Sequence, residues 1–195
     1  MNERKEILKT IIETRRSVKP GFYSAEKVDD AVIHAMLESA RWAPTHGLTE
    51  PWHFVVFTGE GLQKLAEFLS SSYKQQTSLE NFLQAKHEKI ISNILKASHI
   101  ILVGMKRQLN GKIPEVEEIC AVACSVQNML LTAHTHGVGA YWSTGSMSTH
   151  ETTKKIMNLQ EADRCMGMIY VGNYAGEVPV PARTKIFEKA VWMNE

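Results

Sequence analysis

The sequence lacks the features that mark membrane proteins and secreted disulfide-rich proteins. It contains no apolar run of about 18 residues, and its first ten residues mix both charge signs without an apolar stretch. We therefore expect a cytoplasmic protein that does not associate with membranes. Cysteine is scarce as well: the three cysteines are an odd number without paired spacing, which argues against a disulfide framework.

An excess of charge of one sign is also missing. The 22 Lys and Arg residues almost balance the 21 Asp and Glu residues, so the formal net charge is +1. This charge is too small for a nucleic-acid-binding surface, and we expect no nucleic-acid partner. The chain has no internal repeat and no low-complexity segment. Its 195 residues, 44% of them hydrophobic, can bury a sizeable core, so we expect one domain over residues 1–195.

The hydrophobic periodicity predicts alternating helices and strands. Helices are predicted over residues 3–15, from an N-cap at Ser24 to a boundary at Pro44, and over 61–72, 80–96, 114–136 and 149–158. The polar stretch between the third and fourth of these helices is a candidate mobile excursion. Strands are predicted over 52–58, 99–105, 138–142 and 165–171. This alternation, without a strict βαβ phosphate loop, favours an α+β sandwich with a mixed sheet.

A cluster of basic and hydroxyl side chains follows the first predicted helix. Arg15, Arg16 and Ser17 lie where the helix gives way to a loop, and Lys19 comes two residues later. Guanidinium groups match phosphate oxygens in bidentate fashion and serine adds a neutral donor, so the cluster favours a phosphate site. The alternative is a solvated basic pair that complements the helix dipole.

Two turn-rich segments could each border a ligand. Residues 43–52 form a link with prolines at both ends and His46 among apolar neighbours, which suits the edge of a planar heterocycle. The alternative is a plain connector with a packed Trp52. In Tyr141–Ser146 a strand runs directly into glycine and hydroxyl residues, as it does where backbone approaches a ligand closely, although a simple turn has the same composition.

Taken in order, these segments resemble the nitroreductase family of flavoproteins over essentially the whole chain. The resemblance is carried by ETRRSVK, by APTHGLTEPWHFVVF, by the long helix ending in HGVGAYWSTG, and by the YVGN strand with its proline-broken tail. It implies an α+β fold with a central mixed sheet flanked by helices and an extended C-terminal tail. It also implies a homodimer that binds FMN in two equivalent sites at the dimer interface, so that residues 1–195 form one FMN-binding domain.

The resemblance further implies which residues bind the phosphate end of FMN. Arg15 and Ser17 would contact the phosphate or the ribityl chain, and Arg16 and Lys19 would lie near the phosphate or the pyrimidine edge. Lys19 is the candidate for the N1/O2 locus, where positive charge stabilises the reduced ring. Arg183 would be a second phosphate ligand, on a tail that acts across the interface.

At the ring end, the implied contacts come from both turn-rich segments. The other subunit would supply Pro44, Thr45 and His46, whereas Trp142, Ser143, Thr144 and Gly145 would lie along the isoalloxazine, with a backbone N–H of the last two directed at N5. Many relatives carry Asn and Gln where this chain has Leu48 and Glu50, so the polar contacts of this loop differ here.

The implied activity is hydride transfer from NAD(P)H through flavin N5 to a small electrophile such as a nitroaromatic, a quinone or an activated alkene, in a ping-pong cycle. The flavin carries the chemistry, so we expect no side chain to act as the nucleophile. Two alternatives stay open: a flavoenzyme of the same fold with different chemistry, such as flavin destruction or reductive dehalogenation, and a non-catalytic flavin-binding or redox-sensing protein.

The remaining candidates have structural interpretations. Cys120 and Cys124 lie four residues apart on the long helix without ligands at metal spacing, so we expect core thiols and no metal site. His134 and His136, at the end of the same helix, would complement its dipole or line the nicotinamide entrance.

Overall fold

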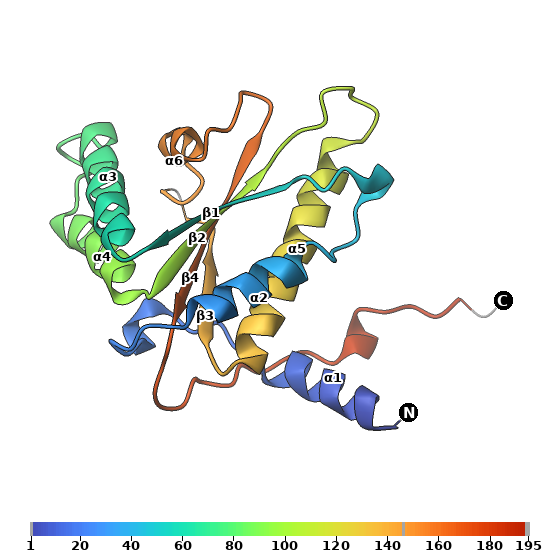
Figure 1. Cartoon of the computed structure of the whole chain (residues 1–195). Coiled ribbons are helices and arrows are strands. Elements are labelled where there is room, and N and C mark those ends of the chain that lie inside the picture. Colours follow the sequence, from blue (N-terminus) through green and yellow to red (C-terminus); the bar gives the residue numbers. More distant parts are fainter. Residues whose placement is uncertain (1, 146, 194–195) are drawn as a thin grey trace.

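The computed structural model describes residues 2–145 and 147–193 and has an α+β architecture in three layers (Figure 1). Helices α3 (Glu60–Gln76) and α4 (Gln84–Lys96) cover one face of a four-stranded sheet, and α2 (Asp30–Ala40) and α5 (Glu115–Thr135) cover the other. The predicted α+β sandwich is therefore confirmed. The strands are β1 (Trp52–Thr58), β2 (His99–Met105), β3 (Gly139–Ser143) and β4 (Arg164–Gly172), in the order β1-β2-β4-β3.

The sheet differs from the expected mixed sheet in how its strands pair. Within residues 2–145 and 147–193, neighbouring strands pair antiparallel, and parallel pairing is confined to an isolated bridge between Ser17 and Ala140. Strands β2 and β3, joined by α5, do run in the same direction, as the strand–helix–strand pattern suggests. Strand β4, which comes later in the chain, lies between them and pairs with both in the opposite sense. The local sequence pattern could not indicate this insertion.

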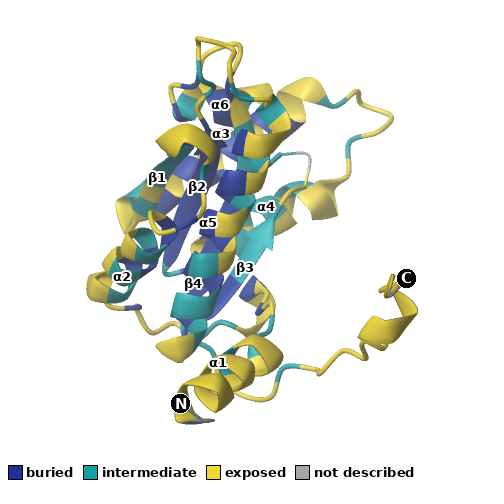
Figure 2. Ribbon diagram, turned by 90° about the vertical axis from the view of Figure 1, so that its right-hand side faces the viewer, coloured by how far each residue is buried: buried dark blue, intermediate teal, exposed yellow. Residues whose placement is uncertain are grey.

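The apolar run of β2 is buried along its whole length because both of its faces are covered. Ile101 and Val103 pack with the α2 and α5 side chains, while Ile100 and Leu102 pack with α3, α4 and the end of β4. Alternate residues of a strand point to opposite faces, so a strand between two helical layers reads as continuously apolar. Figure 2 shows this strand at the buried centre of the molecule.

Several predicted boundaries differ from the observed ones, and two of the differences have a clear local reason. Helix α2 is capped by Asp29, whose carboxylate accepts from Ala31 N at 2.8 Å, and not by Ser24. Ser24 instead donates its N–H to Asn173 O at 2.8 Å, which fixes it beside the end of β4. Helix α3 continues through Gln76 into the polar stretch, because buried Tyr73 extends its apolar face.

The chain ends lie away from the sheet. Helix α1 (Asn2–Thr14) exposes Ile7, Leu8 and Ile12, and the tail beyond Gly176 exposes several large apolar side chains (Figure 2). The minor elements are α6 (Glu151–Ile156) and the short 3-10 turns Pro20–Phe22, His46–Leu48 and Ile186–Glu188. Among the described residues, no helix combines the length and apolarity needed to cross a membrane.

Candidate functional site

The basic cluster of the sequence forms one wall of a pocket. The chain leaves α1 at Thr14 and runs beside β3, where Val18 N donates to Ala140 O at 3.0 Å, so the segment between them is held against the sheet. The tail crosses this segment. Together they enclose about 440 Å³, here called the cationic pocket, lined by Arg15, Arg16, Ser17, Lys19, Phe22, Val178, Pro179, Pro181 and Arg183.

The charges of the cationic pocket are uncompensated. Its lining includes three arginines and one lysine but no aspartate or glutamate. Burial lowers the pKa of Arg15, and the neighbouring charges of Arg16 and Arg183 lower it further. The buried Nε atoms of Arg15 and Arg16 have no hydrogen-bond partner within the described chain. A multiply charged anion with several acceptor oxygens would neutralise the positive charges and accept hydrogen bonds from the unpartnered Nε atoms. A phosphate group has this chemistry.

Arg183 lines the pocket of its own chain, and its charge acts on Arg15 of the same chain. The expected contact of the tail across a subunit interface stays a prediction. Pro179 and Pro181 keep the tail extended as it passes the pocket, because proline cannot continue a helix and restricts the residue before it.

The first turn-rich segment lines a second, separate pocket of about 330 Å³. Pro44, Thr45 and His46 face one side of α5, and we call this space the loop–helix pocket; its other lining residues are Val116, Glu117, Cys120, Ala121 and Cys124. His46 Nδ1 contacts the Glu117 carboxylate. The loop is braced internally, since Thr45 Oγ1 lies 3.0 Å from Thr49 Oγ1 and accepts from Glu50 N at 3.2 Å. No residue lines both this pocket and the cationic pocket.

The two positions at which this loop departs from many relatives have unusual backbone conformations. Leu48 and Glu50 have positive φ angles of 53° and 44°. Such conformations cost non-glycine residues roughly 1–3 kcal/mol each and cluster at ligand-binding and switch segments. Leu48 is 81% exposed, so packing within this chain does not offset the cost of its backbone conformation.

The expectation of core thiols at Cys120 and Cys124 was wrong. Both side chains are exposed and line the loop–helix pocket. The buried stripe of α5 instead passes through Val122, Val126 and Met129, as fits a repeat of three to four residues. Glu117, Cys120 and Cys124 share the neighbouring face. The signal was present in the sequence as this i, i+3, i+7 spacing, one helical face away from the core stripe.

The third predicted segment forms the end of β3. Trp142 Nε1 donates to Met166 O at 3.0 Å, and Ser143 Oγ lies 3.4 Å from Ser148 Oγ. Beyond the strand Thr144 and Gly145 are exposed, and Ser146 lies outside the described residues. The bridge from Ser17 to Ala140 joins this strand to the cationic segment, so these two predicted groups belong to one region of the fold.

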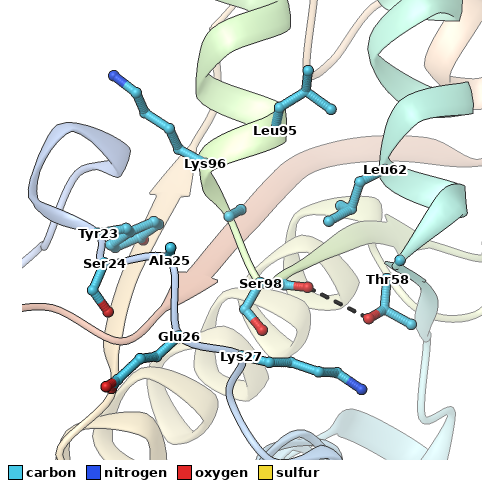
Figure 3. A pocket seen from close by; sticks show the side chains of 12 residues that line it. Tyr23, Ser24, Ala25, Glu26, Lys27, Thr58, Leu62, Leu95, Lys96 and Ser98 are labelled. Carbon is cyan, nitrogen blue, oxygen red and sulfur yellow. Dashed lines mark hydrogen bonds between the residues drawn. The ribbon is translucent and has the colours of Figure 1, made fainter.

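A larger cavity than the cationic pocket lies elsewhere, between the end of α4 and the start of α3 (Figure 3). It encloses about 630 Å³, and several of its polar groups have local partners, although the buried Ser24 Oγ has none within the described chain. Lys27 pairs with Asp30 at 3.0 Å, and Thr58 donates to Ser98 O at 3.4 Å. Size alone therefore does not identify the site, and the unpaired charge in the cationic pocket is the better indicator. Within residues 2–145 and 147–193, no group of His, Cys, Asp and Glu side chains could hold a metal ion.

The chain is similar in sequence and in structure to proteins described as nitroreductases or nitroreductase-like. A family model described as the nitroreductase family matches residues 12–173. The chain is 29% identical to the Bacillus subtilis protein named "Putative NAD(P)H nitroreductase YfhC", over 94% of this chain and 92% of that protein. A crystal structure of a nitroreductase-like family protein from Bacillus cereus has a TM-score of 0.83 at 28% identity and covers 96% of each chain. A structure described as a "putative nitroreductase in complex with fmn" from Desulfovibrio desulfuricans has a TM-score of 0.72 at 26% identity, again over 96% of each chain.

Proposed function

The chain belongs to the nitroreductase family, and we propose that it is a cytoplasmic FMN-dependent NAD(P)H oxidoreductase that reduces a small electrophile. The observation that carries the proposal is the cationic pocket, whose four positive side chains and unpartnered Nε atoms of Arg15 and Arg16 fit a phosphate monoester. The similar Desulfovibrio desulfuricans structure contains FMN, and the Bacillus subtilis relative is named for NAD(P)H.

In this proposal the residues of the cationic pocket hold the phosphate end of FMN. Arg15 and Arg183 supply charge-assisted hydrogen bonds, and Ser17 supplies a neutral donor. Arg16 has less freedom, since its Nη1 already donates to Glu13 O at 2.6 Å and to Arg15 O at 2.8 Å. Its unpartnered Nε and its charge remain to support the anion. Lys19 would reach towards the pyrimidine edge of the ring.

The ring end of the site would need a second copy of the chain. Pro44, Thr45 and His46 line a pocket separate from the cationic one, so we propose that they meet the flavin of the partner subunit in a homodimer. Exposed apolar side chains on α1 and on the tail would supply surface for such an interface. Trp142, Ser143, Thr144 and Gly145 would border the ring from the chain that holds the phosphate.

When bound, FMN supplies hydride transfer through N5, and the protein supplies binding, orientation and electrostatics. The cationic pocket fixes the phosphate end, and Lys19 places positive charge where negative charge develops during reduction. Above the ring, nicotinamide and acceptor would share one space in turn, which implies ping-pong kinetics. Planar nitroaromatics, quinones and activated alkenes are the proposed acceptor classes.

Steady-state oxidation of NADH and NADPH, with menadione or nitrofurazone as acceptor, tests the activity. The proposal predicts turnover and parallel lines in double-reciprocal plots at several acceptor concentrations. A protein that binds FMN but oxidises neither nucleotide would be a flavin-binding or redox-sensing protein instead. Reduction by NAD(P)H without turnover of either acceptor would favour a flavoenzyme of the same fold with different chemistry.

Lys19→Ala is expected to slow the reduction of bound FMN by NAD(P)H by about tenfold, because it removes a positive charge that stabilises the reduced ring. The dissociation constant for FMN should change little, since the arginines hold the phosphate. Anaerobic stopped-flow absorbance measures the rate, with Lys9→Ala, on the exposed surface of α1, as the control. An unaltered reductive rate in Lys19→Ala would remove Lys19 from the ring.

Deletion of residues 177–195 is expected to weaken both dimerisation and FMN retention. The deletion removes exposed Ile186, Phe187 and Trp192, which would be buried against the partner, and it also removes Arg183. Size-exclusion chromatography with light scattering, together with FMN content, measures both effects. Arg183→Ala in the full chain separates them, because it should lose FMN affinity and keep the dimer. A monomeric full-length chain that retains equimolar FMN would contradict the shared site.

A further inference from the structure

A histidine lies directly behind the cationic pocket without lining it. His134, in the last turn of α5, is half-buried, and its Nε2 lies 2.8 Å from Thr14 Oγ1. The Thr14 hydroxyl in turn lies 2.6 Å from Thr10 O. A carbonyl oxygen only accepts, so the single hydroxyl proton goes to Thr10 and the Thr14 oxygen accepts from His134 Nε2–H. His134 is therefore hydrogen-bonded to the residue that immediately precedes Arg15.

The charges that face His134 come mainly from the pocket. Burial lowers the pKa of His134, and the charges of Arg15 and then Arg16 lower it further. Arg183 on the tail acts on Arg15 and is not among the groups that shift His134. The acidic residue nearest in sequence to these arginines, Glu13, is exposed, and it accepts a hydrogen bond from Arg16 through its backbone oxygen.

The position of His134 on its own helix favours the protonated ring, in contrast to burial and the arginine charges. It lies in the last turn of α5, where the carbonyl end of a helix favours a positive charge. His136, at the C-cap of the same helix, is exposed and has no place among the groups that shift His134. An anion in the cationic pocket would cancel the repulsion from Arg15 and Arg16. It would leave the favourable helix end and the hydrogen bond to Thr14 in place.

We propose that His134 is a proton-linked positioning residue of the cationic pocket: it takes up a proton when a phosphate group binds there, and its protonation tightens that binding. The proposal rests on the proposed function, because FMN is the phosphate ligand used to test it. His134 acts through the charge field of the pocket and through Thr14, which anchors the start of the Arg15–Lys19 segment.

The sign of the effect follows from linkage. If anion binding raises the pKa of His134, binding takes up protons at pH values between the free and the bound pKa, and affinity rises as the pH falls through this interval. The free pKa lies below 6.5, so the effect is absent at pH 8 and grows below about pH 6.5. The phosphate of FMN itself gains a proton near pH 6, which weakens binding in wild type and variants alike. The comparison between variants removes this shared term.

The experiment is a titration of the flavin-free protein with FMN at pH 8.0, 6.5 and 5.5, followed by fluorescence quenching. The variants are His134→Gln, which keeps a donor for Thr14 but cannot become charged, and His136→Gln as the matched control on the same helix end. The ratio of the His134→Gln dissociation constant to that of wild type should increase on the order of threefold between pH 8.0 and 5.5, since a pKa rise of about one unit allows at most tenfold. His136→Gln should show a ratio that does not change with pH.

His134→Lys provides the complementary test, because it carries a permanent charge at the same place. This variant should bind FMN at pH 8.0 at least as tightly as wild type, with no additional gain at low pH. Nuclear magnetic resonance of the histidine ring protons, assigned with His134→Gln, should show the His134 pKa rising when FMN is added.

Two outcomes overturn the proposal and differ in what they imply. If FMN binds with the same dependence on pH in wild type and His134→Gln, and the His134 resonance titrates identically with and without FMN, the proton linkage is wrong while the proposed cofactor stands. If no form of the protein binds FMN at any pH, the proposed function fails and this inference fails with it.

Discussion

Arg15→Ala is expected to raise the dissociation constant for FMN by roughly 10- to 150-fold, which corresponds to about 1.5–3 kcal/mol for a lost charge-assisted hydrogen bond. Arg15 is the residue on which the pocket's electrostatics converge: it is partly buried, its Nε has no partner, and it feels both Arg16 and Arg183. The Arg15→Ala substitution removes one of the three guanidinium groups that line the pocket, which contains no acidic side chain.

Titration of the flavin-free protein by fluorescence quenching measures this loss. Arg15→Lys should recover only part of the affinity, because an ammonium group does not reproduce the planar fork of donors. Arg4→Ala, at an exposed arginine of α1, is the control and should leave FMN binding unaltered. An unchanged dissociation constant in Arg15→Ala would remove this residue from the site.

Glu118→Ala is expected to lower the free energy of unfolding by about 3 kcal/mol or more, because breaking a buried ion pair leaves its partner uncompensated. The Glu118 side chain is 1% exposed and contacts the Arg107 guanidinium, which is itself largely buried. Glu118 also accepts from Gln108 N at 3.2 Å, and Arg107 donates to Ile113 O at 2.6 Å. These contacts fasten the loop between β2 and α5 to the helix.

Urea denaturation monitored by circular dichroism measures this change. Glu115→Ala is the matched control, since Glu115 lies one turn earlier on α5 and pairs with Arg164 at 2.6 Å while both side chains remain exposed. An exposed pair contributes about 1 kcal/mol or less, so the two variants should differ clearly. Equal losses in both would show that the Arg107–Glu118 pair does not anchor the loop.

The sequence predicted most accurately the strands whose composition favours a single type of secondary structure. Strands β1 and β2 begin and end at the predicted residues, because β-branched and aromatic runs bounded by polar residues have few alternative structures. The start of α2 was wrong because Ser24 and Asp29 are both good N-cap types, and a hydrogen bond to distant Asn173 decides between them. Such long-range contacts leave no trace in local composition.

The candidate site was predictable only in part, for a similar reason. The basic cluster was recognisable because adjacent residues supply most of its donors, and the structure does bring Arg15, Arg16, Ser17, Lys19 and Arg183 together. Cys120 and Cys124 were assigned to the core because cysteine is usually buried, whereas the phase of α5 turns them towards the loop. His134 became relevant only when the packing of α1 on α5 placed it beside Thr14.

The central claim, that the cationic pocket holds the phosphate of a flavin, is tested most directly by the visible absorbance spectrum of the purified protein after desalting, with its FMN content measured on the denatured sample. The account predicts a yellow protein with the spectrum of oxidised flavin and FMN equimolar with the chain, either as isolated or after incubation with FMN. A colourless protein that stays colourless after incubation with FMN and desalting would contradict it.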